Sequence, residues 1–410
     1  MNKVRNILFL NNYYYLRGGS EKVFFDEIAL LESHGHTVVP FSRKHPDNYK
    51  NSFEKYFPSD LQTEKVRLSL DGVRTVSEIV SSRECKKGLE RLLTEFKPDI
   101  AHAHNIYGRL TSSVIRLLAK KKIPVVMTLH DYKLVCPSYK MEIHGRVCEK
   151  CEGRKFYHAI LNRCLKDSAI ASGVYALESY YNNFLKVYKN NIRYLISPSE
   201  FLKNKLVQYG WDENRIKVIR NSIDLGGYSP SYTGDKYFLY IGRLSREKGI
   251  PTLINAFMQT VGNYKLVIAG SGPLEAQLRS QSSSDNRIHF TGYLTGKSLQ
   301  DIIARATAIV VPSEWYENAP MSVIEGMAYG KPVIGGMIGG IPEQVTHNQN
   351  GLLFKSGDAS DLTKQLQTMI DMVDCDIESL GINARKFVEA NHGFDMHYDM
   401  LTRLYQLAMS

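Results

Sequence analysis

The sequence has 410 residues, 43% of them hydrophobic and 23% charged, a composition that excludes an intrinsically disordered chain. No apolar run approaches the roughly 18 residues that cross a bilayer, which excludes a membrane-spanning protein. The net charge of +10 comes from the first half, because residues 1–200 hold 32 Lys and Arg against 21 Asp and Glu, whereas residues 201–410 hold 20 against 21. The basic half could face anionic lipid head groups or a phosphorylated substrate, and a solvated basic surface is the alternative. A membrane surface is favoured over nucleic acid, for which no motif is present.

The chain begins with a short apolar stretch, residues 1–12, that contains Lys3 and Arg5. It lacks the small-residue cleavage site of a signal peptide, so we expect a first β-strand and a cytoplasmic protein. Peripheral association with the inner face of the plasma membrane is a further expectation. A length of 410 residues exceeds one ordinary core and predicts two domains.

Short β-branched runs alternate with amphipathic stretches in both halves, which is typical of parallel sheets covered by helices. A helix should follow the early Gly-Gly turn, because Phe24, Ile28 and Leu31 recur at i, i+4 and i+7. Residues 211–234 are rich in Gly and Pro and are predicted to be the linker. The predicted strands are residues 7–10, 38–41, 100–102, 125–129, 194–196, 237–241, 266–269, 288–290, 309–311 and 333–334.

The strongest candidate site begins at Glu317, after the predicted strand at 309–311. Pro320 suits the first turn of a helix, so Glu317 should precede that helix and Glu325 should lie in its second turn. The first N–H groups, at residues 321–323, could then bind a phosphate oxygen. Two carboxylates beside an amide cluster suit a ligand with hydroxyls and a phosphate; a capped surface helix is the alternative.

Two glycine-rich loops are further candidates. In residues 242–249, which follow a predicted strand, Arg243 offers a guanidinium fork and Lys248 a point charge to a diphosphate. Gly18 and Gly19 would let backbone approach a phosphate at a helix start. Ordinary polar loops are the alternative for both.

Three more segments complete a pattern with these motifs: residues 221–224, 339–343 and 350–352. Their order and spacing together resemble the family-4 retaining glycosyltransferases over nearly the whole chain, most densely over residues 235–355. The resemblance implies an α/β protein of GT-B fold, with two Rossmann-like domains facing each other across a cleft. We expect an acceptor domain over 1–212 with an insertion over about 136–165, a nucleotide-sugar domain over 213–390, and a C-terminal helix, 391–410, that packs back on the first domain.

The family pattern implies a role for each matched residue. Arg243 and Lys248 would bind the nucleotide diphosphate and neutralise it as it leaves, Glu317 would bind hydroxyls of the transferred sugar, and Glu325 the ribose. The implied catalytic residues are His130, Arg243, Lys248 and Glu317. The implied donor-binding residues are Gly18, Gly19, Tyr293, Leu294, Ala319, Pro320, Met321, Ser322 and Glu325. Glu21, His104 and Asn105 are expected on the acceptor side.

The predicted reaction transfers a hexosyl residue from a UDP- or GDP-linked sugar to a glycan or lipid-linked acceptor, in polysaccharide, capsule or lipopolysaccharide biosynthesis. Preorganised cations would stabilise the charge that develops on the leaving diphosphate. No carboxylate nucleophile is evident, so a front-face retaining pathway is the working hypothesis. Residues 374–376 resemble a metal-binding D-x-D motif but follow a helical stretch; they are interpreted as surface, and no cofactor is expected for catalysis.

Four of the six cysteines cluster in the sequence, in the order Cys136, Cys148, Cys151 and Cys164. A C-x2-C pair flanked by single cysteines fits a tetrahedral structural zinc site. Four free thiols packed in an inserted subdomain are the equal alternative, because disulfides are rare in the cytoplasm.

Other functions remain open at this stage. A sugar-nucleotide epimerase or a phosphorylase of GT-B fold would share the same loops, and a non-catalytic nucleotide- or glycan-binding protein is a further alternative. The epimerase would consume a nucleotide sugar with no acceptor present, and the phosphorylase would need pyridoxal phosphate. A binding protein would leave the opposed acids and cations without a role.

Overall fold

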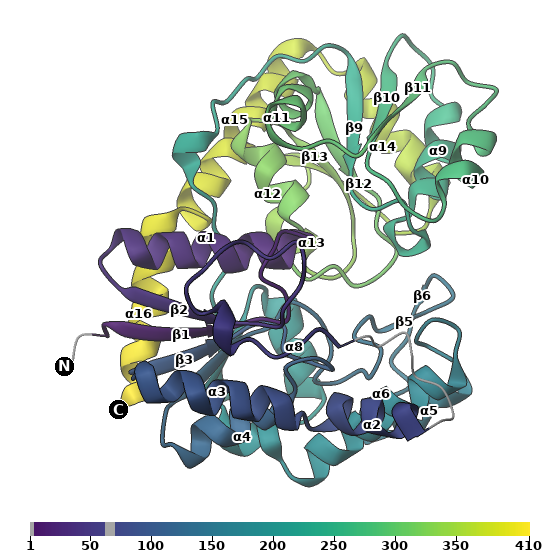
Figure 1. Ribbon diagram of the computed structural model, residues 1–410. Coiled ribbons are helices and arrows are strands. Elements are labelled where there is room, and N and C mark those ends of the chain that lie inside the picture. The colour runs from purple at the N-terminus through teal and green to yellow at the C-terminus, as the bar shows by residue number, and fades with distance from the viewer. Residues whose placement is uncertain (1–3, 62–69) are drawn as a thin grey trace. The chain divides into compact units, whose positions relative to one another are not determined.

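The computed structural model describes residues 4–61 and 70–410 and divides into two compact units (Figure 1). Unit 1 consists of Met1–Met141, Cys148–Ile219 and His397–Ser410, and unit 2 of Glu142–Val147 and Arg220–Met396. Each unit is built on one six-stranded parallel sheet. The prediction of two Rossmann-like α/β domains is therefore confirmed. No helix in the described ranges is long and apolar enough to span a membrane.

The sheet of unit 1 has the strand order β2-β1-β3-β4-β7-β8. Its strands are β1 (Asn6–Leu10), β2 (Thr37–Phe41), β3 (Ile100–Ala103), β4 (Val125–Thr128), β7 (Tyr194–Ser197) and β8 (Ile216–Val218). The order reverses between β1 and β3, and ligands of open α/β sheets bind beyond the carboxyl ends of the strands at such a point.

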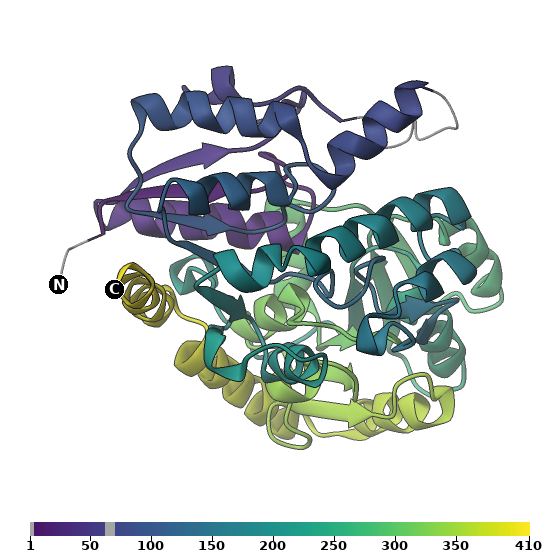
Figure 2. The ribbon, with the colours of Figure 1, turned by 90° about the horizontal axis from the view of Figure 1, so that it is seen from below.

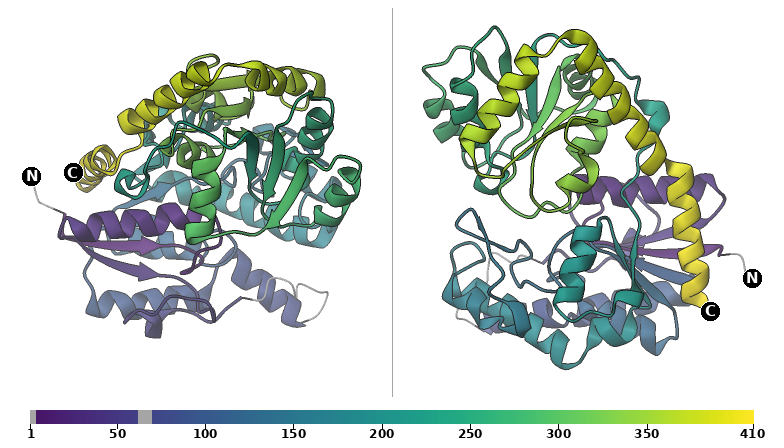
Figure 3. Two further views of the ribbon diagram at one scale, coloured as in Figure 1. Left: turned by 90° about the horizontal axis from the view of Figure 1, so that it is seen from above. Right: turned by 180° about the vertical axis from the view of Figure 1, so that it is seen from behind.

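Helices cover both faces of this sheet. Figure 1 shows α1 (Gly19–Ser33) on one side and α3 (Arg83–Glu95) and α4 (Ser112–Lys120) on the other. The last helix, α16 (Phe394–Met409), buries Leu401, Leu404 and Tyr405 in one cluster with residues of α1 and the strands. The right view of Figure 3 shows this helix from behind. The remaining helices are α2 (Leu70–Val80), α5 (Tyr157–Leu161), α6 (Ala169–Phe184), α7 (Val187–Asn191) and α8 (Glu200–Gln208).

The sheet of unit 2 has the order β11-β10-β9-β12-β13-β14, so its central strands β9 and β12 flank the reversal point. Its strands are β9 (Tyr237–Ile241), β10 (Lys265–Ala269), β11 (Ile288–Gly292), β12 (Ala308–Val311), β13 (Val333–Gly336) and β14 (Gly351–Phe354). Its helices are α9 (Ile250–Met258), α10 (Glu275–Gln281), α11 (Gly296–Arg305), α12 (Met321–Ala328), α13 (Ile341–Gln344), α14 (Ala359–Asp371) and α15 (Asp374–Asn391). A short antiparallel hairpin, β5 (Glu142–Ile143) and β6 (Arg146–Val147), is separate from both sheets.

Each predicted strand has an observed counterpart, but four strands of the described residues were not predicted: β5, β6, β8 and β14. β14, which pairs with β13 at the edge of the second sheet, begins at Gly351 and contains no β-branched residue, so a search for β-branched runs does not find it. The linker prediction over residues 211–234 is wrong in part, because Ile216–Val218 forms β8, the edge strand that pairs with β7. Residues 374–376 open α15, with Cys375 exposed.

Candidate active site

Two loops meet at the carboxyl edge of the unit 2 sheet, one after β9 and one after β12. Gly249 closes the first loop with φ +68°, and a Cβ there would lie 1.9 Å from the carbonyl oxygen of Pro312 in the second. Only glycine permits this approach. The N–H of Glu314 also donates to the carbonyl of Glu247, with N···O 2.9 Å. The two loops are therefore fixed to each other.

Lys248 and Glu317 form an ion pair across these loops. The Nζ of Lys248 lies 2.7 Å from Oε1 of Glu317, which also accepts a hydrogen bond of 2.6 Å from the Ser313 hydroxyl. Burial alone would raise the pKa of Glu317, but the ammonium of Lys248 and these hydrogen bonds outweigh it and hold the pKa below its usual value. Lys248 also lies 5.1 Å from the ring centroid of Trp315. A cation and an ionised carboxylate thus lie together at the edge where open α/β sheets bind ligands.

The loop after β13 supports Glu317 from its backbone side. Gly339 has φ +60°, and a Cβ there would lie 2.2 Å from the carbonyl oxygen of Glu317. The N–H of Gly340 donates to that same oxygen, with N···O 2.8 Å. Asn221 contacts the same loop two residues after Glu317, since its side-chain amide donates to the carbonyl of Ala319 at 3.2 Å. The segments at 339–343 and 221–224 therefore position the Glu317 loop.

Helix α12 starts one residue later than predicted. Pro320 is its N-cap and not part of its first turn, and the N–H of Val323 donates to the Pro320 carbonyl at 3.1 Å. This amide is therefore already used, which corrects the prediction of three amides facing a ligand. Met321 and Ser322 open the helix, and Glu325 lies in its second turn as expected, partly buried.

The other predicted donor residues lie at the same strand ends but differ in environment. Arg243 is exposed at the start of the β9 loop, where its carbonyl accepts a hydrogen bond from the buried Tyr240 hydroxyl at 2.9 Å. Tyr293 follows β11 and is 73% exposed, whereas Leu294 packs against the core of unit 2. The structure thus brings Lys248 and Glu317 into direct contact and leaves Arg243 and Tyr293 open to solvent.

In unit 1, the loop after β1 leads into α1 at Gly18 and Gly19. Gly18 is the N-cap, and a Cβ built there would have no atom within 4 Å. Glu21 lies in the first turn but is only 5% exposed, and burial raises its pKa. The glycines therefore present open backbone at the β1–β3 reversal point.

A chain of side chains leads from the core of unit 1 to His130, which follows β4. Nε2 of His130 lies 2.9 Å from Nδ1 of His104, and Nε2 of His104 lies 3.4 Å from Oε2 of Glu27. His104 has no exposed surface, so it cannot touch a ligand directly and contacts His130 instead. Burial, together with His104, lowers the pKa of His130 to about 3, so its imidazole is neutral at physiological pH.

Glu27 is the centre of this chain and was not singled out from the sequence. It lies on α1, 2% exposed, and its Oε1 is 3.2 Å from Nε2 of His397 on α16. His102 packs beside it, with Nδ1 2.7 Å from the Tyr405 hydroxyl. Burial opposes the charge on Glu27, but the surrounding imidazoles outweigh it and hold its pKa well below the usual value. The feature of the sequence that could have identified Glu27 is its position as an acid on the apolar face of the predicted helix.

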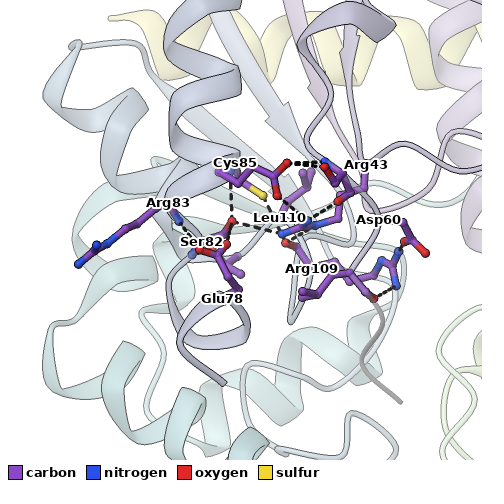
Figure 4. Close-up of polar contacts among 12 residues, drawn as sticks. Arg43, Asp60, Glu78, Ser82, Arg83, Cys85, Arg109 and Leu110 are labelled. Atoms are coloured by element: carbon purple, nitrogen blue, oxygen red, sulfur yellow. Dashed lines mark hydrogen bonds and ion pairs between the residues drawn. The ribbon is translucent and has the colours of Figure 1, made fainter. Parts of the chain in front are cut away.

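A buried arginine fixes the loop after β3. Arg43 is 1% exposed, and its guanidinium donates to the carbonyl of Arg109 at 2.8 Å and to the Ser82 hydroxyl at 3.2 Å (Figure 4). The side chain of Arg109 pairs with Asp60 and lies 4.8 Å from the ring centroid of Tyr13. Asn105 belongs to the same edge, since its backbone N–H donates to the Asn11 side chain at 3.1 Å. Sequence reasoning missed Arg43 because a basic residue directly after a strand is usually solvated.

The four clustered cysteines all lie in unit 1 and carry free thiols. Cys136 and Cys151 are buried. Burial, together with the nearby Cys136, Cys148 and Cys164, raises the pKa of Cys151 to about 12. Among the described residues, only Glu27, His102 and His104 bring three possible ligand atoms within 4.8 Å of one another, and this group includes no cysteine. Zinc binding by the cysteines stays a prediction.

Comparison with known proteins gives matches over both units. A family model described as Glycosyltransferase Family 4 matches residues 17–226, and one described as Glycosyl transferases group 1 matches residues 228–387. Among curated proteins, an uncharacterized glycosyltransferase of Methanocaldococcus jannaschii is 28% identical over 241 residues, 52% of this chain and 60% of that protein. An uncharacterized protein in the cps region of Klebsiella pneumoniae is 25% identical over 356 residues, 82% of this chain and 87% of that protein.

The amylovoran biosynthesis glycosyltransferase AmsK of Erwinia amylovora is 25% identical over 56% of this chain and 60% of its own length. The matched region thus spans less than two thirds of the length of two of these three relatives. Among solved structures, sucrose-phosphate synthase of Thermosynechococcus elongatus superposes with a TM-score of 0.72 at 19% identity, covering 98% of both chains. HepE of Anabaena, in complex with UDP and glucose, superposes with a TM-score of 0.64 at 17% identity, covering 98% of this chain and 99% of its own. These likenesses confirm the GT-B fold, and the family matches over both units show that the chain belongs to the family-4 glycosyltransferases.

Proposed function

We propose that the protein is a retaining glycosyltransferase that transfers a hexosyl residue from a nucleotide-diphosphate sugar to a glycan or lipid-linked acceptor. The observation that carries the proposal is the Lys248–Glu317 pair at the β9–β12 reversal point, 2.7 Å apart and held by glycine contacts on both sides. A cation there suits a diphosphate, and a carboxylate suits sugar hydroxyls. UDP is the preferred nucleotide, because HepE, of the same fold, was solved with UDP and with UDP-glucose.

The chemistry follows from where charge develops. Cleavage of the bond between sugar and diphosphate leaves negative charge on the leaving oxygens, which Lys248 and the exposed Arg243 would neutralise. Glu317 is ionised and would accept hydrogen bonds from the sugar, while Lys248 would pass from this carboxylate toward the phosphate. Glu325, Tyr293 and the α12 N-terminus would complete the donor site.

Unit 1 would supply His130 and the acceptor side, with Gly18, Gly19, Glu21 and Asn105 at the same strand ends. A proton on Nε2 of His104 would point to Glu27, so that Nδ1 of His104 accepts from Nε2–H of His130. The remaining nitrogen of His130, Nδ1, then carries a lone pair that can accept a hydrogen bond from a donor-sugar hydroxyl. Glu27 and His104 would thus be positioning residues for His130.

The biological setting belongs to the same proposal. The cps-region and amylovoran relatives favour bacterial polysaccharide, capsule or lipopolysaccharide assembly. The excess of basic residues in the first half favours a cytoplasmic enzyme that works at the inner face of the plasma membrane.

The test is a panel of UDP- and GDP-sugars with and without membrane-extracted acceptors, followed by NMR of the anomeric proton in the product. Transfer with retained configuration supports the proposal. An inverted linkage would refute the front-face pathway, and consumption of the nucleotide sugar without acceptor would favour an epimerase or a hydrolase.

A further inference from the structure

An exposed apolar surface covers α5 and α6 in unit 1. Phe184 is 85% exposed, Leu161 72% and Leu177 53%. Large exposed apolar patches on soluble proteins mark interaction sites. The surface, which we name the α5–α6 surface, consists of Tyr157, Ile160, Leu161, Ile170, Leu177, Tyr180, Phe184 and Leu185.

Helix α6 is amphipathic, but its apolar face is exposed to solvent and its polar face is buried. Ile170, Leu177 and Phe184 recur every seven residues, with Tyr180 between the last two, so all four lie on one outward face. The inward face is polar and includes Glu178, whose carboxylate pairs with Nζ of the buried Lys133 at 2.7 Å.

Further polar contacts fix that inward face. The same Nζ of Lys133 also donates to the Ser179 hydroxyl at 3.4 Å, and within the helix the Asn182 amide donates to Glu178 at 3.0 Å. Rotation of the helix to bury its apolar stripe would break the Lys133–Glu178 pair and leave buried charges unpaired. The apolar face is therefore held outward by the fold.

The surface continues from α6 onto α5. The backbone N–H of Tyr157 donates to the Tyr180 hydroxyl at 3.2 Å, and the rings of Phe156 and Tyr180 have centroids 5.1 Å apart. The two helices pack against each other, and α2 packs along α6 (Figures 1 and 2). The exposed apolar side chains of both helices thus belong to one part of unit 1.

Exposed cations lie in the same segment of the chain as these apolar side chains. Exposed basic residues outnumber exposed acids over residues 152–186: they are Arg154, Lys155, Arg163, Lys166 and Lys186, against Glu152 and Asp167. Lys189 lies close to two of them, since burial and then the charges of Arg154 and Lys186 lower its pKa. Positive charges near an exposed apolar face favour the binding of an anionic partner.

We propose that the α5–α6 surface docks the protein on an anionic phospholipid membrane. The apolar side chains enter the boundary between head groups and acyl chains, and the surrounding cations contact lipid phosphates. A second copy of the chain fits less well, because a two-fold interface brings the same patch together and would oppose the two sets of cations. This membrane contact rests on the proposed function, in which the enzyme works at a membrane surface. Docking itself requires neither donor nor acceptor, so docking and glycosyl transfer can be refuted independently.

The experiment is co-sedimentation of the full chain with vesicles of phosphatidylcholine that contain about 30% phosphatidylglycerol, compared with pure phosphatidylcholine. We expect binding to the anionic vesicles that weakens in high salt. Leu177→Ser with Phe184→Ser should lower the partition coefficient about tenfold or more, because two large apolar groups no longer enter the bilayer. Leu407→Ser, at another exposed leucine on α16, is the matched control and should bind as the wild type does.

A second pair of variants tests the charges. Arg163→Gln and Lys166→Gln should each weaken binding about fivefold, whereas Lys297→Gln and Lys355→Gln, exposed lysines of unit 2, should have no effect. Size-exclusion chromatography with light scattering measures the oligomeric state of the wild type and of every variant. Equal binding to both vesicle types, unchanged binding after Phe184→Ser, or a wild-type dimer that this variant dissociates would overturn the proposal.

Discussion

The Lys248–Glu317 pair allows a quantitative test of the candidate site without any substrate. Lys248→Met keeps an unbranched side chain, one atom shorter, but leaves the Glu317 carboxylate, which is 6% exposed, without its cation. Removing one partner of a fully buried ion pair costs about 3–5 kcal/mol. Because the Lys248 side chain is 26% exposed and water screens part of the interaction, we expect a loss of about 2–3 kcal/mol.

The pH dependence has a definite sign. In the wild type the pKa of Glu317 is lowered, so its stabilisation is fully present above the unfolded value of 4.5 and is lost as the pH falls through the lower folded value. In Lys248→Met, burial becomes the main influence and should raise the pKa of Glu317 above 4.5. The carboxyl group then destabilises the variant at neutral pH and gains a proton as the pH falls. The difference in stability should therefore be widest near neutrality and shrink toward acid pH.

The assay is thermal unfolding at about pH 7 and at about pH 5, where a unit of this size loses about 2–4 °C per kcal/mol. Lys297→Met is the matched control: its partner Asp301 lies 2.9 Å away, but both side chains are exposed, so the loss should stay below about 0.5 kcal/mol. Adding Glu317→Gln to Lys248→Met should recover most of the loss, because no buried charge remains. Wild-type stability of Lys248→Met, or a deficit that grows in acid, would refute this reasoning.

Three further predictions address the positioning and metal sites. Glu27→Gln should lower kcat about tenfold or more and leave donor affinity nearly unchanged, as steady-state kinetics and calorimetry can show; equal loss in both would indicate mere misfolding. Gly339→Ala should destabilise unit 2 by about 1–3 kcal/mol, because its Cβ would meet the carbonyl of Glu317, and unchanged thermal unfolding would contradict the 2.2 Å approach. If the cysteines bind zinc, metal analysis should give near-stoichiometric zinc that Cys151→Ser removes, and metal-free wild-type protein would exclude the site.

Much of the fold was predictable because local pattern determines it. Central strands such as β9 and β12 are continuous β-branched and apolar runs, and these appear directly in the sequence. β8 has only three residues, one of them the exposed Lys217, and lies at an edge where pairing with β7 decides its structure. The pattern of residues within β8 carries no information about its pairing with β7, so the sequence did not reveal this strand.

The candidate site was predictable in its loops but not in its contacts. Glycines and charges after strands identified the segments of Lys248 and Glu317, 69 residues apart, but their contact depends on β9 and β12 being neighbours. The Glu27 chain shows the same limit, since His397 lies 370 residues away from Glu27. The α5–α6 surface was hidden for another reason: a heptad of Ile170, Leu177 and Phe184 is the usual pattern of a buried helix face.

The central claim is that the loops after β9 and β12 bind a nucleoside diphosphate through Lys248. Titration calorimetry with UDP and GDP on the wild type, Lys248→Met and the Lys297→Met control measures this directly. We predict binding of one of the two nucleotides that falls about tenfold to a hundredfold in Lys248→Met, the loss of one charge-assisted contact, and is unchanged in Lys297→Met. Undiminished binding by a folded Lys248→Met protein, or no binding of either nucleotide by the wild type, would contradict the account.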